Sequence, residues 1–389
     1  MNPPMLRQSE RGSFNRCKQR WWWDWREGLV PRSADLGPLW FGTGIHVALA
    51  AWYCGPGIKR GPEPGETWER YVADSVAYVK DMRPIGDDER VAKYVDAAAL
   101  GVIMLEGYRA RYGRDEHMHV IAPELTGSTE IPWPKGQNLY DVEEGDVMSV
   151  LAWTTDLVYR DLRNDWLAVE EHKTAKQIST RHLALDNQGG TYWAMATRSL
   201  RAKGLIKPKE VLRGIEYNFL RKSVPDDRPR DAEGYYVNKP VKADYVRALE
   251  SHLSEARWGS EAEKEAEFAR LKKLPLAGME ELAIANGLEV LGERSKIQPS
   301  ALFERHMVHR TSVEQRTQLQ RIQDEAFSMW PYRDGTMPLT KNPTKDCGWD
   351  CSFYQMCELQ ERGGNWENFK ALTYRSQDPY ADHRKSAEE

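Results

Sequence analysis

The stretch Trp166–Thr174, "WLAVEEHKT", joins a short apolar run to a group of ionisable residues. Residues 166–169 predict a buried strand, because they are apolar and follow the polar turn "RDLRND". Side chains alternate along a strand, so Glu171 and Lys173 are expected on one face, where the strand leaves the core. In open α/β sheets, ligands bind at the carboxyl ends of the strands. The stretch therefore predicts two charged side chains that share a cleft, although the same pattern is also typical of the plain edge of a core.

A second apolar run lies just upstream and carries an acidic residue. Residues 147–161, "VMSVLAWTTDLVYRD", predict a strand that contains Asp156. A short polar turn separates the two strands, which predicts a hairpin that brings Asp156 close to Glu171. Two neighbouring carboxylates repel each other unless a cation neutralises them, and oxygen ligands suit Mg²⁺ or Mn²⁺. Lys173 beside such an ion is suited to orient a water or to stabilise charge on a phosphoryl oxygen, as phosphodiester hydrolysis requires.

Asp156 followed by Glu171 and Lys173 on the next strand resembles the PD-(D/E)xK nuclease superfamily, in particular its RecB-like exonuclease branch. The segment "FGTGIHVALAAWY" is similar to that branch's N-terminal motif, with His46 early on a helix. The segment "DNQGGTYWAMATRSL" is similar to its Gln-x-x-x-Tyr motif, with Gln188 and Tyr192 on one helix face. Taken alone, His46 also fits a packed core histidine, and Gln188 also fits a plain helix start.

The resemblance implies roles for these residues. His46, Asp156, Glu171 and the main-chain carbonyl of His172 would bind Mg²⁺ or Mn²⁺. Lys173 would position the attacking water and offset developing charge. The remaining pair, Gln188 and Tyr192, would hold the phosphate or the lysine in register.

Cysteines form a second candidate metal site. Cys347, Cys351 and Cys357 lie close together in "CGWDCSFYQMC", and Cys17 lies in the N-terminal segment. In a reducing compartment such a group indicates metal binding rather than disulfides. The resemblance to the RecB-like branch, which includes CRISPR-associated exonucleases, implies that these four residues hold a [4Fe-4S] cluster. Cys54 is expected to be a buried apolar residue.

The spacing of the first two C-terminal cysteines departs from the family pattern. Three residues separate Cys347 from Cys351, where the family usually has two. Zinc therefore stays open as an alternative, because tetrahedral thiolate sites tolerate varied spacing, and a cysteine group that binds no metal stays open as well. A cluster bound by both ends of the chain would be structural, joining the termini across the nuclease core.

The resemblance also implies the fold class. We expect an α/β protein with a restriction-endonuclease-like core, in which helices flank a mixed central sheet. One nuclease domain is expected over residues 1–389, and its parts are a core at 90–223, cluster-binding termini at 1–60 and 331–375, and a mainly helical insertion at 240–330.

Two strands are expected ahead of the Asp156 strand, at residues 117–125 and 128–133. Glu124 ends the first of them and is a second-rank acidic candidate. The tryptophan-rich segment 21–25 is expected to serve as core or as cover for the cluster.

The C-terminal part of the chain contains a clear helix start. Thr311 with Glu314 predicts a capping box for a helix that runs to Trp330 and turns Leu319, Ile322 and Phe327 inward. The last stretch, "SQDPYADHRKSAEE" at 376–389, is polar and predicts a disordered tail.

Composition limits the function classes. The 389 residues contain no apolar run long enough to cross a bilayer and no N-terminal segment like a signal peptide. We therefore expect a soluble cytoplasmic protein, in the bacterial host cytoplasm if a phage encodes it, with no membrane partner. The sequence has no Gly-x-x-x-x-Gly-Lys loop, which argues against an ATP-driven helicase.

Charge is distributed unevenly along the chain. The net charge is -4, but residues 1–32 carry seven Lys and Arg against three acids, and residues 198–222 carry eight against two. Such segments are consistent with a basic channel for a phosphate backbone, and also with a solvated surface. DNA, either single-stranded or a duplex with ends, is the expected partner.

The sequence thus predicts a metal-dependent DNA exonuclease, most similar to stand-alone phage exonucleases of recombination, replication and repair. A recombinase or a single-strand annealing protein is a candidate partner, and the motifs do not specify an oligomer. Two alternatives stay open. One is a CRISPR-associated nuclease that trims new spacers, and the other is a non-catalytic iron-sulfur protein that binds DNA ends.

Overall fold

The structure is a computed structural model that describes residues 3–32, 39–54, 61–81, 88–137, 140–143, 145–254 and 258–381. Its contacts divide the chain into two units. The first comprises Met1–Ser223 with Phe303–Glu389, and the second comprises Val224–Leu302. Each unit has a hydrophobic core of its own.

The first unit contains both ends of the chain. Its N-terminal elements are β1 (Met5–Arg7), α1 (Gln8–Arg16), α2 (Lys18–Trp21), η1 (Trp22–Arg26), β2 (Leu29–Pro31), α3 (Trp40–Trp52), α4 (Pro64–Asp81) and α5 (Asp88–Tyr112). The middle elements are β3 (Met118–Pro132), β4 (Val147–Asp161), β5 (Trp166–Ala175), η2 (Leu183–Leu185), α6 (Asn187–Ala202) and β6 (Leu212–Arg221). The C-terminal elements are β7 (Phe303–His309), α10 (Ser312–Arg333), α11 (Cys347–Asp350), α12 (Tyr354–Glu361), α13 (Trp366–Thr373) and β8 (Tyr374–Ser376).

A mixed sheet forms the centre of this unit. Within the described residues it has six strands in the order β1-β4-β5-β6-β7, with β3 paired to β4. β4 and β5 form an antiparallel hairpin, as the sequence predicts, and β5 runs parallel to β6. Parallel neighbours need a crossover connection, and α6 supplies it. This mixed sheet with its flanking helices is consistent with a restriction-endonuclease-like α/β fold.

Strand β4 has two different partners along one edge, because β3 pairs with the other edge over its whole length. β1 pairs with residues 150–152 of β4, and β5 pairs with residues 157–161. Residue 156 therefore lies where β5 has just separated from β4. This local opening of the sheet leaves room for side chains and backbone groups to meet.

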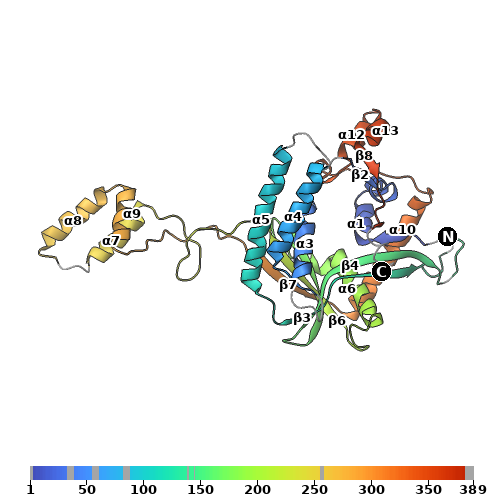
Figure 1. The fold of residues 1–389 in the computed structure, drawn as a ribbon, viewed down its shortest axis with the longest axis horizontal. Helices are drawn as coiled ribbons and strands as arrows, with labels where there is room; N and C mark the ends of the chain where they lie inside the picture. Colours follow the sequence, from blue (N-terminus) through green and yellow to red (C-terminus); the bar gives the residue numbers. More distant parts are fainter. Residues whose placement is uncertain are drawn as a thin grey trace. The chain divides into compact units, whose positions relative to one another are not determined.

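Two layers of helices cover the sheet (Figure 1). One face packs against α3, α4 and α5, and Ile45 and Trp68 belong to that core together with Leu157 and Tyr159 of β4. The other face packs against α1, α6 and α10 through residues such as Val158 and Val169. Neighbouring strand residues enter opposite cores, as the two-residue period of a strand requires.

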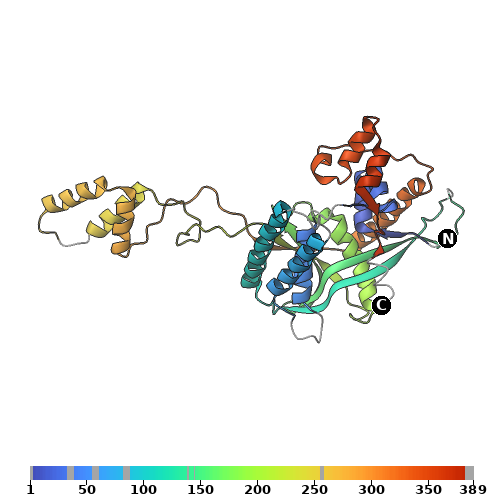
Figure 2. The same cartoon turned by 45° about the horizontal axis from the view of Figure 1, so that its top comes forward.

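Two short strands from the N-terminal and C-terminal parts of the chain pair beside this core (Figure 2). β2 and β8 form a small antiparallel sheet, in which Val30 pairs with Arg375. Around it, Trp23 packs with Phe353, Met356 and other apolar residues of the C-terminal helices. Trp21 and Trp23 are almost completely buried, which confirms the prediction that the tryptophan-rich segment is core.

The second unit is a small helical cluster. It contains α7 (Lys242–Ser254), α8 (Glu261–Lys273) and α9 (Leu276–Ala285). Leu249 and Met279 are fully buried at the centre of its core. None of the helices in the described parts of the chain is both long enough and apolar enough to cross a membrane.

Three local predictions are wrong. Residues 118–132 form one continuous strand, β3, rather than two. At Gly127, which lies between the two predicted strands, the indole of Trp153 packs so closely that an added Cβ would lie 2.4 Å from the ring. Leu319 of α10 is 41 % exposed, whereas Ile322 is buried as predicted. The capping box of Thr311 and Glu314 is confirmed.

The third wrong prediction concerns the disordered tail. Residue 376 belongs to β8, and Tyr380 is buried. The Tyr380 hydroxyl donates a hydrogen bond of 2.6 Å to the buried carboxylate of Glu10. Residues 382–389 of the predicted tail lie outside the described residues. The buried tyrosine explains why a polar sequence is nevertheless ordered up to this point.

Candidate functional site

Asp156 lies at the opening between β4 and β5. Its Oδ2 accepts a hydrogen bond of 2.7 Å from the backbone N–H of His172. In an extended strand the N–H and C=O of one residue point to the same side. The main-chain carbonyl of His172, a predicted metal ligand, therefore also faces the side on which Asp156 lies.

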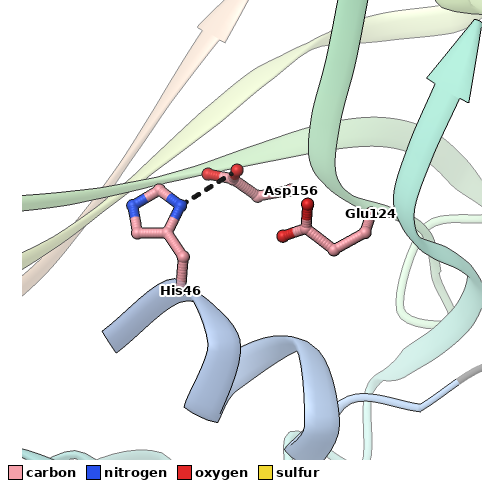
Figure 3. Close-up of side chains that lie close together, drawn as sticks. All are labelled: His46, Glu124 and Asp156. Atoms are coloured by element: carbon pink, nitrogen blue, oxygen red, sulfur yellow. Dashed lines mark hydrogen bonds and ion pairs between the residues drawn. The ribbon is translucent and has the colours of Figure 1, made fainter. Parts of the chain in front are cut away.

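His46 and Glu124 approach Asp156 from two other elements (Figure 3). His46 comes from α3, and its Nδ1 lies 3.1 Å from Oδ1 of Asp156. Glu124 comes from β3, where its φ of 44° is in the left-handed region that non-glycine residues rarely adopt. One ligand atom from each of these three residues lies within 4.8 Å of the others. The three side chains could hold one metal ion.

Glu171 and Lys173 lie on the same face of β5, as predicted. Nζ of Lys173 is 2.8 Å from Oε1 of Glu171 and 2.9 Å from Oε1 of Gln188. Gln188 in turn donates to the hydroxyl of Tyr192, at 3.2 Å, one turn further along α6. Asp186 caps this helix by accepting from the N–H of Gly189. A continuous chain of polar contacts therefore links the carboxylate of Glu171 to α6.

Burial and the neighbouring charges shift the pKa values of these groups. Burial and the nearby Asp156 raise the pKa of Glu171 to about 7, despite the opposing effect of Lys173. Burial also acts to raise the pKa of Asp156, but His46 and the His172 amide outweigh it and hold that pKa below its ordinary value. Burial acts to lower the pKa of His46, and Asp156 outweighs it, so that this pKa is raised. The positive charge near Asp156 and Glu171 therefore does not fully offset the negative charge of the two carboxylates.

The donor set fits a divalent cation. Oε2 of Glu171 is buried and has no hydrogen-bond partner among the described residues. His46, Glu124, Glu171 and Lys173 all line one cavity of about 650 Å³. A buried carboxylate oxygen without a partner is costly, and a hard cation bound by oxygen and imidazole ligands would satisfy it.

A buried ionic network lies directly behind this site. Arg305 of β7 donates 2.7 Å hydrogen bonds to both carboxylate oxygens of Asp115 and also contacts the hydroxyls of Tyr53 and Tyr108. Its Nε lies 3.9 Å from the carboxylate of Glu170. These five residues come from segments far apart in the sequence, so no motif could reveal them.

Asn218 of β6 connects that network to the site. Its side-chain amide donates to Oε1 of Glu170 at 2.9 Å and lies 3.1 Å from Nδ1 of His172. Burial lowers the pKa of His172 to about 3, so the ring is neutral. The imidazole of His172 is thus fixed on one face of β5, while Glu171 and Lys173 project from the other.

The four predicted cluster ligands also come together. Cys17, Cys347, Cys351 and Cys357 line a single cavity of about 260 Å³, and all of the cysteines are free thiols. No three of their sulfurs lie within 4.8 Å of one another, because the only such group in the described residues is the His46 group. A tetrahedral zinc ion with Zn–S bonds of ~2.3 Å would need sulfurs about 3.8 Å apart. Cys54 is not in this cavity and is half-buried rather than buried.

The structure therefore brings the predicted metal ligands and catalytic residues together in one place, and the four predicted cluster ligands in another. Glu124 is the one acidic residue that the sequence ranked second and the geometry places beside His46 and Asp156. Its position in an unbroken strand gave no local signal. Its unusual φ shows that the surrounding fold holds it there against a backbone preference.

The sequence model of the PD-(D/E)XK nuclease superfamily matches residues 8–358. That range includes both groups of residues described above. No curated protein matches the chain.

Proposed function

The chain belongs to the PD-(D/E)XK nuclease superfamily, and on that premise we propose that it is an exonuclease that hydrolyses DNA with the help of a divalent metal ion. The observation that carries the proposal is the unpartnered, buried Oε2 of Glu171 on the same cavity as His46. A second carboxylate, Asp156, lies nearby and helps to raise the pKa of Glu171, and carboxylates grouped on a cavity in this way are typical of a functional site.

The metal ligands in this proposal are His46, Asp156, Glu171 and the main-chain carbonyl of His172, with Glu124 as a further ligand. Mg²⁺ or Mn²⁺ bound there would polarise a phosphoryl oxygen and lower the pKa of a bound water. The protein itself holds the carboxylates in place. The His172 N–H fixes one oxygen of Asp156, and Lys173 fixes one oxygen of Glu171.

Lys173 is the proposed catalytic cation. It is held between Glu171 and Gln188, so its ammonium group already points along the wall of the cavity. An ammonium in this position can orient a water and offset negative charge as it develops on the phosphate. Gln188 and Tyr192 are positioning residues, since their contacts limit the directions in which the lysine can point.

The proposal includes a [4Fe-4S] cluster at Cys17, Cys347, Cys351 and Cys357. Four thiols on one cavity, farther apart than a single zinc ion requires, support a cluster rather than an ion. The cluster would be structural, because its ligands come from both ends of the chain. A cytoplasmic role in phage DNA recombination, replication or repair, beside a recombinase or annealing protein, completes the proposal.

The decisive experiment compares the anaerobically purified protein with Lys173→Ala. Both are incubated with end-labelled single-stranded and duplex DNA, and with closed circular DNA, in Mg²⁺, Mn²⁺ or EDTA. The matched control is Lys176→Ala, which removes an exposed lysine three residues further along the chain, just past the end of β5.

The proposal expects metal-dependent release of nucleotides from linear DNA by the wild type and the control, none by Lys173→Ala, and intact circles throughout. Cleavage of the circles would show an endonuclease instead. An absence of digestion by all three proteins on every substrate would overturn the proposal.

A further inference from the structure

A second large cavity lies at the opposite end of β6 from the metal site. Its volume is about 670 Å³, and arginines from three segments line it. Arg198 and Arg201 come from α6, Arg213 comes from the start of β6, and Arg310 precedes α10. No Asp or Glu is among the described residues that line this cavity. The four positively charged guanidinium groups around this cavity repel one another unless an anion binds between them.

Two of these arginines have free guanidinium groups. Arg198 and Arg213 are exposed, and neither guanidinium group makes a hydrogen bond or ion pair within the described residues. Arg201 uses one N–H for the main-chain carbonyl of Glu210. The backbone N–H of Arg310 donates to the carbonyl of Arg213 at 3.0 Å, so these two arginines are fixed as neighbours.

Arg310 is the fixed member of the group. Its side chain is only 8 % exposed, and its terminal nitrogens donate to the carbonyls of Leu183 and Ala184. Its Nε is buried and has no partner. The nearest acid is Glu314, at 3.6 Å, but that carboxylate already accepts from the N–H and hydroxyl of Thr311. A buried donor without an acceptor, on a cavity lined by cations, indicates a site for an anion.

The start of α10 adds further donors to the same cavity. Thr311 and Ser312 both line it. The first N–H groups of a helix have no partner within the helix, and here the side chain of Thr311 takes up that of Glu314. A helix of 22 residues also has the positive end of its dipole at this point. Guanidinium groups and a helix start together match the geometry of a phosphate.

We propose that this arginine cavity binds a phosphate group carried on the DNA substrate, at a distance from the metal site. The inference rests on the proposed function. Residue 219, which pairs with Lys173, lies seven residues beyond Leu212 of the cavity, or roughly 23 Å along the strand. That separation corresponds to about seven nucleotides of a B-form strand. The cavity would therefore hold the strand several nucleotides away from the bond that is cut.

The test measures DNA binding rather than digestion. Affinity is measured by fluorescence anisotropy in EDTA, with labelled oligonucleotides that end in either a phosphate or a hydroxyl group. Three proteins are compared: the wild type, Arg198→Glu with Arg213→Glu, and Arg316→Glu as the control. Arg316 is an exposed arginine on α10 that does not line the cavity.

The expected result is a loss of affinity of about a hundredfold in the double variant, or about tenfold for each lost charged contact. The slope of log affinity against log salt concentration should also decrease in magnitude by about two, which is one for each phosphate contact removed. The control should change neither quantity appreciably. A loss confined to phosphate-ended strands would assign the site to the end of the strand, and an equal loss on both would assign it to internal phosphates.

Unchanged affinity and salt dependence in the double variant would overturn the inference. Release of the labelled oligonucleotide by an acidic peptide, but not by an unlabelled oligonucleotide, would also overturn the inference, since the cavity would then serve a protein partner. These outcomes are separate from the proposed function, because Lys173→Ala tests digestion without altering this cavity. Circular dichroism and thermal unfolding check that the double variant is folded.

Discussion

The backbone N–H of His172 and the carboxylate of Asp156 are joined across the opening of the β4–β5 hairpin, at 2.7 Å. This contact ties the conformation of β5 to the orientation of an acidic side chain on β4. Glu171 is the residue that precedes His172 on β5, so one hydrogen bond also sets the spacing of the two carboxylates. The geometry of the site is thus a property of the hairpin rather than of flexible loops.

Asp156→Asn should abolish metal binding without unfolding the protein. The amide keeps the shape of the side chain and can still accept from His172, but it lacks the charge that a cation requires. Digestion should fall by at least about a thousandfold. Mn²⁺ should raise the melting temperature of the wild type, since it binds only the folded state, and should not raise that of the variant.

The control for this prediction is Asp161→Asn, on the same strand. Asp161 is bound by Arg163 rather than by the site residues. It should keep both digestion and the Mn²⁺-induced rise in melting temperature. An equal rise in Asp156→Asn would show that the metal is held elsewhere.

Gln188→Ala should reduce turnover by about ten- to a hundredfold, because Lys173 loses one of the two contacts that orient it. Tyr192→Phe should have a smaller effect, since it acts only through Gln188. We expect kcat to fall and KM to change little, as measured in steady-state digestion. Ser199→Ala, further along α6, is the control. A rise in KM alone would mean that Gln188 binds the substrate directly.

Arg305→Met should lower the free energy of unfolding by about 3–5 kcal/mol, because Asp115 and Glu170 would stay buried without their cation. Urea unfolding measures this change. Arg109→Met removes an arginine whose pair with Glu63 is solvent-exposed, so it should cost less than about 1 kcal/mol. Adding Asp115→Asn to Arg305→Met should recover part of the loss. Equal stability of the two single variants would contradict the assigned role of the network.

Cys351→Ser should lose iron and labile sulfide, measured after anaerobic purification, because one of the four thiolates of the proposed cluster is absent. Cys54→Ser is the matched control. It removes a thiol outside the cavity, so it should keep the full iron content. Zinc in place of iron in the wild type would contradict the cluster and revive the alternative that the cysteine spacing leaves open.

Tyr380→Phe should destabilise the protein by about 1 kcal/mol, since Glu10 loses one of its buried hydrogen bonds. Glu10 would still accept from Trp21 and Arg333, which is why the loss should be modest. Tyr78→Phe, at an exposed tyrosine, should leave the unfolding curve unchanged. A Tyr380→Phe protein as stable as the wild type would mean that the C-terminal segment contributes nothing to the core.

The sequence predicts the central hairpin because its information is local. Apolar runs of strand length on both sides of a polar turn set the pairing of β4 with β5, and the two-residue period then puts Glu171 and Lys173 on one face. The cap of α6 by Asp186 and the capping box of α10 are local in the same sense. The resemblance to a known family supplied the rest of the site, since neither His46 nor Gln188 has a distinctive signal of its own.

What the sequence did not reveal depends on contacts between distant segments. Position 127 has room only for a glycine because the indole of Trp153 packs against it. In the sequence alone, a glycine between polar residues predicts a turn. Arg305 and Asp115 are 190 residues apart, and each alone is an ordinary charged residue. The C-terminal segment is held in place by the hydrogen bond from Tyr380 to Glu10. No local sequence pattern predicts this contact.

The pairing of β2 with β8 has a consequence for biosynthesis. Residues 29–31 wait for residues 374–376 before they can join a sheet, and Cys17 meets the other cysteines only after residue 357 has been made. On the ribosome, residues 29–31 therefore stay without their partner strand until residue 376 has been made. Contacts of such long sequence separation form late. A nascent chain that lacks the segment from Phe353 to Tyr374 would expose Trp23, and chaperones and proteases could distinguish it from a chain in which that segment is present.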